Sequence, residues 1–229
     1  MNRNEIIQSL LDTSYRKSYL EIGVANGDIF TEIKAEYKIG VDPISPSELV
    51  KASVNETCIY NMMTSDDFFA QIADTDYKFD VVFVDGLHEH EQAYRDIINS
   101  LKHLSSGGVI VVHDCTPMNE VMSLPPKMYT SVDKATRDGI GRGMWMGDVW
   151  KAVVQIRSFH RDLFVFTLDC DCGCAIITNG IPEFSLNYSL AEIKTMGFDD
   201  FIKNQDSLLN LKSYDYFYTF LKNTKYMRD

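Results

Sequence analysis

Two apolar runs of this sequence end in ionisable groups. The first is followed by Asp85 and, three residues later, by His88; the second is followed by His113 and Asp114. Charged groups at the end of a buried strand are costly unless they are paired or bind something. Asp85 and Asp114 are hard oxygen ligands that suit Mg²⁺, and His113 is acceptable to Mn²⁺ or Fe²⁺. Both ends are therefore candidate sites.

These residue types predict metal-assisted chemistry on a hydroxyl. A dication held by Asp85, His113 and Asp114 would bind and acidify a substrate hydroxyl, as template and Lewis acid. His88 titrates near neutral pH and could accept the hydroxyl proton. The candidate catalytic residues are thus His88, Asp85 and His113, and the pattern does not decide which histidine is the base. A second interpretation also fits: both histidines cap helices and bond the backbone, without a metal.

An acid–glycine turn lies near the start of the chain. An apolar run leads into Glu21, Gly23 and Gly27, spaced E-x-G-x-x-x-G, and the next apolar run ends at Asp42. In a parallel sheet such a unit builds a nucleotide site at the carboxyl ends of its strands. A dinucleotide turn is spaced G-x-G-x-x-G and holds a pyrophosphate, which Glu21 would repel. The turn therefore favours a cationic ligand, and Asp42 is placed to accept hydrogen bonds from the hydroxyls of a ribose. The alternative is that the turn binds no ligand.

The elements that would position these groups alternate between strand and helix. One strand is expected to start at Tyr19, and six more are expected at Lys38–Val41, Thr57–Met62, Phe79–Val84, Val109–Val112, Phe164–Leu168 and Ala175–Thr178. The last two are expected to form an antiparallel hairpin at the edge of the sheet. Helices are expected at Glu5–Leu11, Asp28–Tyr37, Ser45–Ala52, from Thr64, at Glu91–His103 and after Asp148. We predict an α/β fold with a Rossmann-like, doubly wound, seven-stranded, mostly parallel sheet whose last strand is antiparallel.

We expect one domain over residues 1–229. The core of this domain spans about residues 14–178 and contains a lid-like insertion at residues 117–147. A helical tail follows at residues 182–229. Loops as long as the insertion tend to be lids or binding segments, and Arg137 and Trp145 could contact a substrate there; a partly disordered insertion is the alternative. The aromatic tail suits docking on the domain or a homo-oligomer contact, through Tyr214, Tyr216, Phe217, Tyr218 and Phe220.

The acid–glycine turn resembles motif I of the class I S-adenosylmethionine (SAM)-dependent methyltransferases, whose cofactor carries a sulfonium and an amino group. The resemblance implies that the loop before the helix from Thr64 packs on the adenine, although helix capping accounts for that loop equally well. The cofactor-binding residues that it implies are Glu21, Gly23, Ala25, Gly27, Asp42, Ser65, Asp66 and Asp85.

Three later motifs occur in order: Asp85-Gly86-Leu87-His88, His113-Asp114-Cys115 and Gly147–Ala152. They resemble a bacterial methyltransferase group related to macrolide-sugar and metal-dependent O-methyltransferases. In catechol O-methyltransferase the proton acceptor is a lysine and the last metal ligand an asparagine, so the histidines here differ. The resemblance implies SAM-dependent methylation of a small-molecule or sugar hydroxyl, with Mg²⁺ or another divalent cation. The alternatives are a non-catalytic or hydroxylase-like Rossmann-fold protein of glycan or secondary-metabolite biosynthesis, and an oxidoreductase, which the glycine spacing disfavours.

The amino-acid composition limits the kinds of molecule with which this protein is expected to interact. The chain has 229 residues and a formal net charge of −11, and it lacks the Lys/Arg cluster of a nucleic-acid binder. No apolar run approaches the roughly 18 residues of a membrane span, and the N-terminus lacks a secretory apolar core. We therefore expect a cytoplasmic protein that acts on a small molecule with a hydroxyl group, and neither nucleic acid nor a membrane as partner.

Five cysteines fit a reduced compartment. Three of them fall in Cys170-Asp171-Cys172-Gly173-Cys174, where alternate residues of a strand face the same way. Three thiols could converge on a metal, but structural zinc normally takes four ligands from paired knuckles, and no second knuckle is present. The sequence favours small buried apolar residues on a sheet face.

Overall fold

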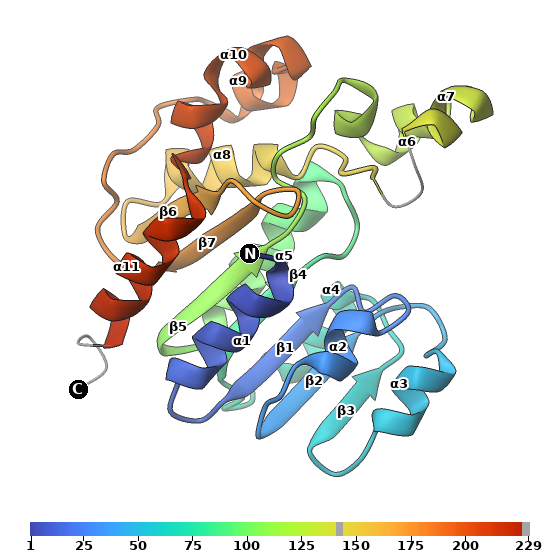
Figure 1. Cartoon of the computed structure of the whole chain (residues 1–229), viewed down its shortest axis with the longest axis vertical. Helices are drawn as coiled ribbons and strands as arrows, with labels where there is room; N and C mark the ends of the chain where they lie inside the picture. Colours follow the sequence, from blue (N-terminus) through green and yellow to red (C-terminus); the bar gives the residue numbers. More distant parts are fainter. Residues whose placement is uncertain (141–143, 226–229) are drawn as a thin grey trace. The chain divides into compact units, whose positions relative to one another are not determined.

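The structure, a computed structural model, describes residues 1–140 and 144–225 (Figure 1). The chain divides into two compact units. The first comprises Met1–Gly86, Arg95–Val112 and Asp215–Asp229, and the second comprises Leu87–Tyr94 and His113–Tyr214. Within the described ranges no helix is both long and apolar enough to cross a membrane.

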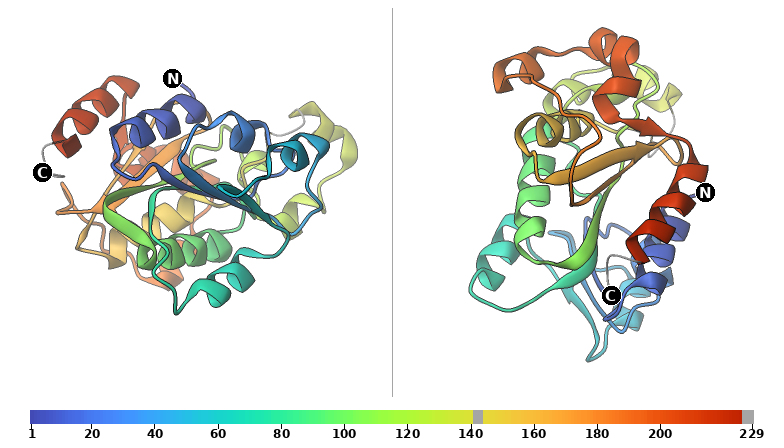
Figure 2. Two further views of the ribbon diagram at one scale, coloured as in Figure 1. Left: turned by 90° about the horizontal axis from the view of Figure 1, so that it is seen from below. Right: turned by 90° about the vertical axis from the view of Figure 1, so that its left-hand side faces the viewer.

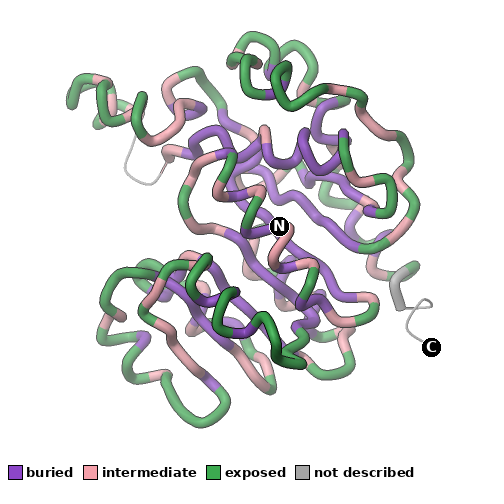
Figure 3. Tube along the Cα trace, turned by 180° about the vertical axis from the view of Figure 1, so that it is seen from behind, coloured by how far each residue is buried: buried purple, intermediate pink, exposed green. Residues whose placement is uncertain are grey.

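Five parallel strands form the sheet of the first unit, in the order β3-β2-β1-β4-β5. The chain order of these strands reverses between β1 and β4, which makes this pair the topological switch point, where ligands bind in open α/β sheets. Every residue of β1 and β4 is buried, as expected of parallel strands covered on both faces (Figure 3). The strands are β1 (Ser18–Ile22), β2 (Tyr37–Val41), β3 (Cys58–Asn61), β4 (Phe79–Val84) and β5 (Leu104–Val112).

Helices cover both faces of this sheet. α1 and α2 lie on one face, and α4 and the first unit's part of α5 lie on the other (Figure 2), so the unit is doubly wound. Asn2 caps α1 in a reciprocal box with Glu5, which satisfies backbone donors of the first turn. The helices are α1 (Arg3–Thr13), α2 (Asp28–Glu32), α3 (Glu48–Ser53), α4 (Ser65–Ile72), α5 (His90–Lys102) and α11 (Tyr214–Lys225).

The second unit is built on three strands, β6 (Leu163–Leu168), β7 (Cys174–Asn179) and β8 (Leu211–Lys212). β6 pairs antiparallel with β7 and parallel with β8. Helix α8 packs against β6, and its Trp150 ring lies 4.9 Å from the ring of Phe201 on α10. The helical elements are η1 (Val121–Ser123), α6 (Pro126–Tyr129), α7 (Lys134–Gly139), α8 (Trp150–Phe159), α9 (Leu190–Thr195) and α10 (Phe198–Leu209).

The structure confirms the predicted α/β, Rossmann-like class with a mostly parallel sheet, and the antiparallel hairpin. It has eight strands in the described residues where seven were predicted. β8, only two residues long, pairs with β6, so β6 is not the free edge that the hairpin predicted. A two-residue strand carries no alternation that a sequence pattern can show.

Three expected boundaries were wrong. α2 ends at Glu32 rather than Tyr37, because Ile33 is extended and the Nζ of Lys38 donates to the carbonyls of Phe30 and Ile33. The cap of α3 is Ser47 rather than Ser45, since the Ser47 hydroxyl accepts from the amide of Val50 at 3.2 Å. β5 begins at Leu104, so the serines and glycines before Val109 belong to a strand and not to a loop.

Other departures concern the insertion and the tail. Within 117–147 the chain forms three short helical segments, η1, α6 and α7, and residues 141–143 lie outside the described ranges. Asp148 does not cap α8 with its side chain: its Oδ1 accepts from the amide of His90 at 2.8 Å. In the tail, Phe217 and Phe220 are buried whereas Tyr214 and Tyr218 are exposed, so part of the aromatic surface packs inward.

Candidate functional site

The acid–glycine turn follows β1 in the first unit. Gly23 and Gly27 have φ of +86° and +88°, a left-handed conformation that side chains disfavour. A Cβ on Gly23 would lie 2.1 Å from the carbonyl oxygen of Asp85. Glycine is therefore required where the ends of β1 and β4 approach most closely, at the switch point.

Asp42 ties the end of β2 to this turn. Its side chain is 7% exposed. Oδ2 accepts from the amide of Ala25 at 2.9 Å, and Oδ1 accepts from the amide of Ile44 at 3.0 Å. An ionised carboxylate has about four lone-pair sites, so each oxygen retains capacity for a further donor. This leaves room for the predicted ribose contact.

Glu21 is a buried acid on β1, two residues before Gly23 of the turn. The residue is 1% exposed, and its Oε2 accepts from the hydroxyl of Tyr19 at 2.5 Å. Burial raises the pKa of Glu21 to about 8; the Tyr19 hydrogen bond opposes this rise, and the charge of Asp85 adds to it. A cation beside Glu21 would offset the cost of ionising a buried carboxyl. The raised pKa therefore reports the burial of Glu21, and its predicted contact with a cationic ligand stays a prediction.

Asp85, directly after β4, pairs with Arg3 of α1. The Nη1 of Arg3 lies 3.5 Å from Oδ2 of Asp85. The sequence interpretation missed Arg3 as a site residue. The signal that could have found it is the Asn2–Glu5 spacing, which starts a helix at residue 3 and so fixes where its first side chain points.

The loop before α4 is capped by Thr64, whose hydroxyl accepts from the amide of Asp67 at 3.1 Å. Ser65 is the first helical residue. Asp66 is half-exposed, and its Oδ2 lies 3.5 Å from the Nε of Arg95. Capping therefore accounts for Thr64, and the expected adenine contact of Ser65 and Asp66 stays a prediction.

In the second unit His88 is held at both ring nitrogens. Its Nδ1 lies 2.9 Å from the carbonyl oxygen of Trp145, and its Nε2 lies 3.2 Å from Oδ2 of Asp114. A carbonyl can only accept, so Nδ1 donates to it. When Nε2 also carries a proton it donates to the Asp114 carboxylate. The ring can thus take up a proton at Nε2 and keep both contacts, which suits a general base.

The insertion predicted as a lid supplies the support for His88. The rings of Tyr129 and Trp145 stack with centroids 4.8 Å apart, and the indole Nε1 donates to the carbonyl of Leu124 at 2.7 Å. Gly147 has φ of +64°, and a Cβ there would lie 1.8 Å from the carbonyl oxygen of His88. Trp145 therefore contacts the ring of His88 and Gly147 contacts its backbone, and the expected contact of Trp145 with substrate stays a prediction.

His113 lies on the other side of Asp114. It is 3% exposed, and its Nδ1 lies 3.1 Å from Oδ1 of Asp114. The Asp114 carboxylate thus lies between two imidazoles, and its backbone has a φ of +60°. The structure brings His88, His113 and Asp114 together in the second unit. Asp85 belongs to the first unit, so the expected metal triad stays a prediction, as does the choice of base.

All five cysteines are free thiols. Cys174 starts β7 and is buried, but Cys170 and Cys172 lie in the β6–β7 turn and are partly exposed. The prediction of buried residues on a sheet face is therefore wrong for these two. β6 ends at Leu168, before the first of the three cysteines, so this strand does not run through them.

Comparisons with known proteins agree with this geometry. Residues 20–115 match a family described as a methyltransferase domain. None of the curated protein sequences compared matches the chain significantly. Among solved structures, an O-methyltransferase from Bacillus cereus in complex with SAH has 14% identity and a TM-score of 0.52, covering 77% of this chain and 80% of its own.

Two further structures are similar. A putative caffeoyl-CoA O-methyltransferase from Staphylococcus aureus has 15% identity and a TM-score of 0.52, covering 77% of this chain and 82% of its own. The O-methyltransferase TomG from Streptomyces achromogenes, in complex with SAM, has 14% identity and a TM-score of 0.50, covering 77% and 78%. These likenesses establish the fold, and the family match covers the turn, Asp42, Asp85 and the end of β5. Residues 20–115 thus form a methyltransferase domain, and the fold of the chain is that of the O-methyltransferases named above.

Proposed function

We propose that the protein transfers a methyl group from SAM to a hydroxyl of a small molecule or sugar. The observation that carries this proposal is the pair formed by His88 and Asp114, with Nε2 and Oδ2 3.2 Å apart. His88 follows Asp85 by three residues in the sequence. A base that a carboxylate holds in place is what hydroxyl methylation needs.

The residues of the first unit fit a cationic nucleoside cofactor. Glu21 is a buried acid whose pKa is raised to about 8, and a neighbouring positive charge would stabilise its ionised form. Asp42, at the end of β2, is the acid that would accept from the ribose hydroxyls. The left-handed turn at Gly23 and Gly27 brings backbone, rather than side chain, up to the ligand.

The bound cofactor supplies a methyl group on a positively charged sulfur, which is already an activated donor. The chain supplies alignment, whose effect on rate can be large. His88 accepts the hydroxyl proton at Nε2 while Nδ1 stays bonded to the Trp145 carbonyl. The oxygen forms its bond to the methyl carbon as the carbon–sulfur bond breaks and its electron pair returns to sulfur. Asp114 stabilises the imidazolium that results.

A divalent cation remains part of the proposal. Asp85, His113 and Asp114 are its expected ligands, and carboxylate oxygens favour Mg²⁺. Calorimetric titration with SAM, with and without Mg²⁺, tests this separately. Cofactor binding or turnover that depends on Mg²⁺ supports the cation. Identical behaviour in EDTA removes it and leaves the methyl transfer in place.

The central experiment incubates the protein with SAM and a panel of sugar and catechol hydroxyl acceptors, and measures SAH by mass spectrometry. We expect His88→Ala to lower kcat by about 10²–10⁴-fold while the Kd for SAM stays within twofold. His160→Asn is the matched control: His160 lies in the same unit beside Tyr94, and its loss should leave turnover unchanged. Full turnover by His88→Ala would contradict the assigned base.

A further inference from the structure

The turn between β6 and β7 has an unusual backbone. Asp171, Cys172 and Gly173 are three consecutive residues with positive φ, at 46°, 63° and 83°. The amide of Gly173 donates to the carbonyl of Cys170 at 2.8 Å, which closes the turn. Left-handed conformations are strained for residues other than glycine. This backbone directs the side chains of Asp171 and Cys172.

The same turn is fastened to the segment that follows β5. The amide of Cys115 donates to the carbonyl of Gly173 at 3.1 Å, and the amide of Thr116 donates to that of Cys172 at 2.9 Å. A Cβ on Gly173 would lie 2.6 Å from the Cγ2 of Thr116. Two backbone hydrogen bonds therefore fix the turn beside His113.

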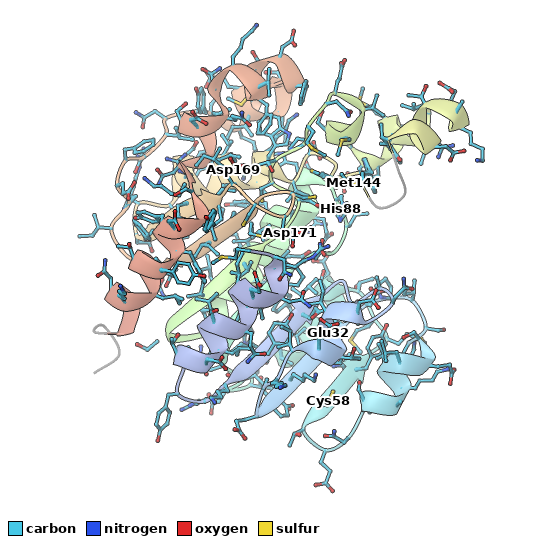
Figure 4. The ribbon with its side chains drawn as sticks, viewed as in Figure 1. Glu32, Cys58, His88, Met144, Asp169 and Asp171 are labelled. Carbon is cyan, nitrogen blue, oxygen red and sulfur yellow. The ribbon has the colours of Figure 1, made fainter. Side chains whose placement is uncertain are left out.

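Three metal-ligating groups of different chemistry meet there. His113, Asp171 and Cys172 can each offer one ligand atom, and these atoms lie within 4.8 Å of one another. The Nε2 of His113 is 3.9 Å from Oδ1 of Asp171, which is too long for a hydrogen bond. Two ligands on one tetrahedral Zn²⁺ lie about 3.5 Å apart, given metal–ligand bonds of about 2.0–2.3 Å. Figure 4 marks Asp171 and His88 among the side chains of this unit.

Asp114 contacts the ring nitrogen of His113 that does not face Asp171. Its Oδ1 lies 3.1 Å from the Nδ1 of His113. A histidine that ligates a metal usually donates its other ring N–H to a carboxylate, which fixes the tautomer and the ring orientation. With Nδ1 turned to Asp114, it is the Nε2 of His113 that faces Asp171.

We propose that His113, Asp171 and Cys172 form a site for a borderline transition-metal ion of the Zn²⁺ or Co²⁺ class. An imidazole, a carboxylate and a thiolate match such an ion and suit Mg²⁺ poorly. Three protein ligands leave a fourth position open to water or another small ligand. Binding releases the Cys172 thiol proton. This site shares only His113 with the triad predicted from the sequence, and it stands whether or not the methyl acceptor is a hydroxyl.

The experiment titrates Co²⁺ into the full-length, tag-free protein and follows its absorption spectrum, with Zn²⁺ competition and elemental analysis for stoichiometry. We expect one ion per chain and a thiolate-to-Co²⁺ charge-transfer band. Cys172→Ser should abolish the band, and Asp171→Asn should weaken binding about 10–100-fold. Cys170→Ser, in the same turn, and Cys58→Ser, on β3, are matched controls that should keep both the band and the affinity.

Asp85→Asn separates this site from the predicted triad, and it should bind Co²⁺ like the wild type. Loss of the band in that variant, or in Cys170→Ser, would overturn the assignment. Wild-type protein that takes up no stoichiometric ion would also overturn it. Circular dichroism of Cys172→Ser checks folding, and Zn²⁺ should raise the Tm of the wild type but not that of a folded Cys172→Ser.

Discussion

The Nε2 atom of His88 lies 3.2 Å from Oδ2 of Asp114. The two residues follow different apolar runs and are joined only by folding. The other nitrogen of the ring is bonded to the Trp145 carbonyl, so the imidazole has one defined orientation and a partner that stabilises its protonated form. The proposed proton acceptor therefore belongs to the second unit, whereas Glu21 and Asp42, the acids proposed to bind the cofactor, belong to the first.

We expect Glu21 to make the folding stability fall as pH rises. Its pKa is raised from 4.5 to about 8 by burial, so the folded chain retains a proton that the unfolded chain has lost. The stabilising contribution is complete below pH 4.5 and is lost as pH rises through about 8, on the order of a few kcal/mol. Urea unfolding of the unliganded protein between pH 5 and 9 measures the slope. Glu21→Gln, which cannot ionise, should flatten it; an unchanged slope would mean that another group is responsible.

SAM binding should release a proton near neutral pH. A cation next to Glu21 lowers the pKa of that carboxyl from about 8, so affinity should rise with pH up to this value. Calorimetry in buffers of different ionisation enthalpy counts the protons. We expect a substantial fraction of one proton at pH 7 for SAM, and less for SAH, which lacks the sulfonium charge. The Glu21→Gln variant should release no proton when it binds SAM. If the variant and the wild type released the same number of protons, Glu21 would not contact the cofactor.

Gly147→Ala should displace His88. A Cβ at this position would lie 1.8 Å from the His88 carbonyl oxygen, on a backbone with φ of +64°. The left-handed strain alone costs about 1–2 kcal/mol, and the clash must be relieved by moving one of the two segments. We expect a lower Tm and a large fall in kcat, with SAM affinity retained. Gly139→Ala, where a Cβ would meet no atom within 4 Å, should change neither quantity. Normal kcat in Gly147→Ala would show that the position of His88 is not critical.

Asp42→Ala should weaken SAM binding by at least tenfold. The substitution removes the proposed ribose acceptor and also the hydrogen bonds to the amides of Ala25 and Ile44. Asp42→Asn retains one acceptor oxygen and should lie between the alanine variant and the wild type. Titration with SAH at fixed pH measures all three affinities. An alanine variant that binds as tightly as the wild type would show that the ribose lies elsewhere.

Sequence pattern predicted most of the first unit. Phe79–Val84 is a strand with the expected bounds because it is almost entirely apolar and buried. The acid–glycine turn is visible because Gly23 and Gly27 have the positive φ that glycine favours. The end of α2 was misplaced because Lys38, in the following strand, takes up two of its carbonyls. That interaction is set by folding and not by local propensity.

Parts of the site depend on contacts between distant segments. Trp145 was expected to contact substrate, whereas its contact with His88 joins residues that are 57 positions apart in the sequence. The C-x-C-x-C motif indicated a strand with three aligned thiols, whereas the left-handed turn presents Asp171 and Cys172 to His113. No periodicity in the sequence reports such a turn, because the hydrogen bonds that fix it come from Cys115 and Thr116.

The chain passes between the two units four times, after Gly86, Tyr94, Val112 and Tyr214. Neither unit is therefore a continuous stretch of sequence, and no truncation at a single point can isolate one of them intact. Exchange of either unit with that of a related protein would therefore need four junctions rather than one.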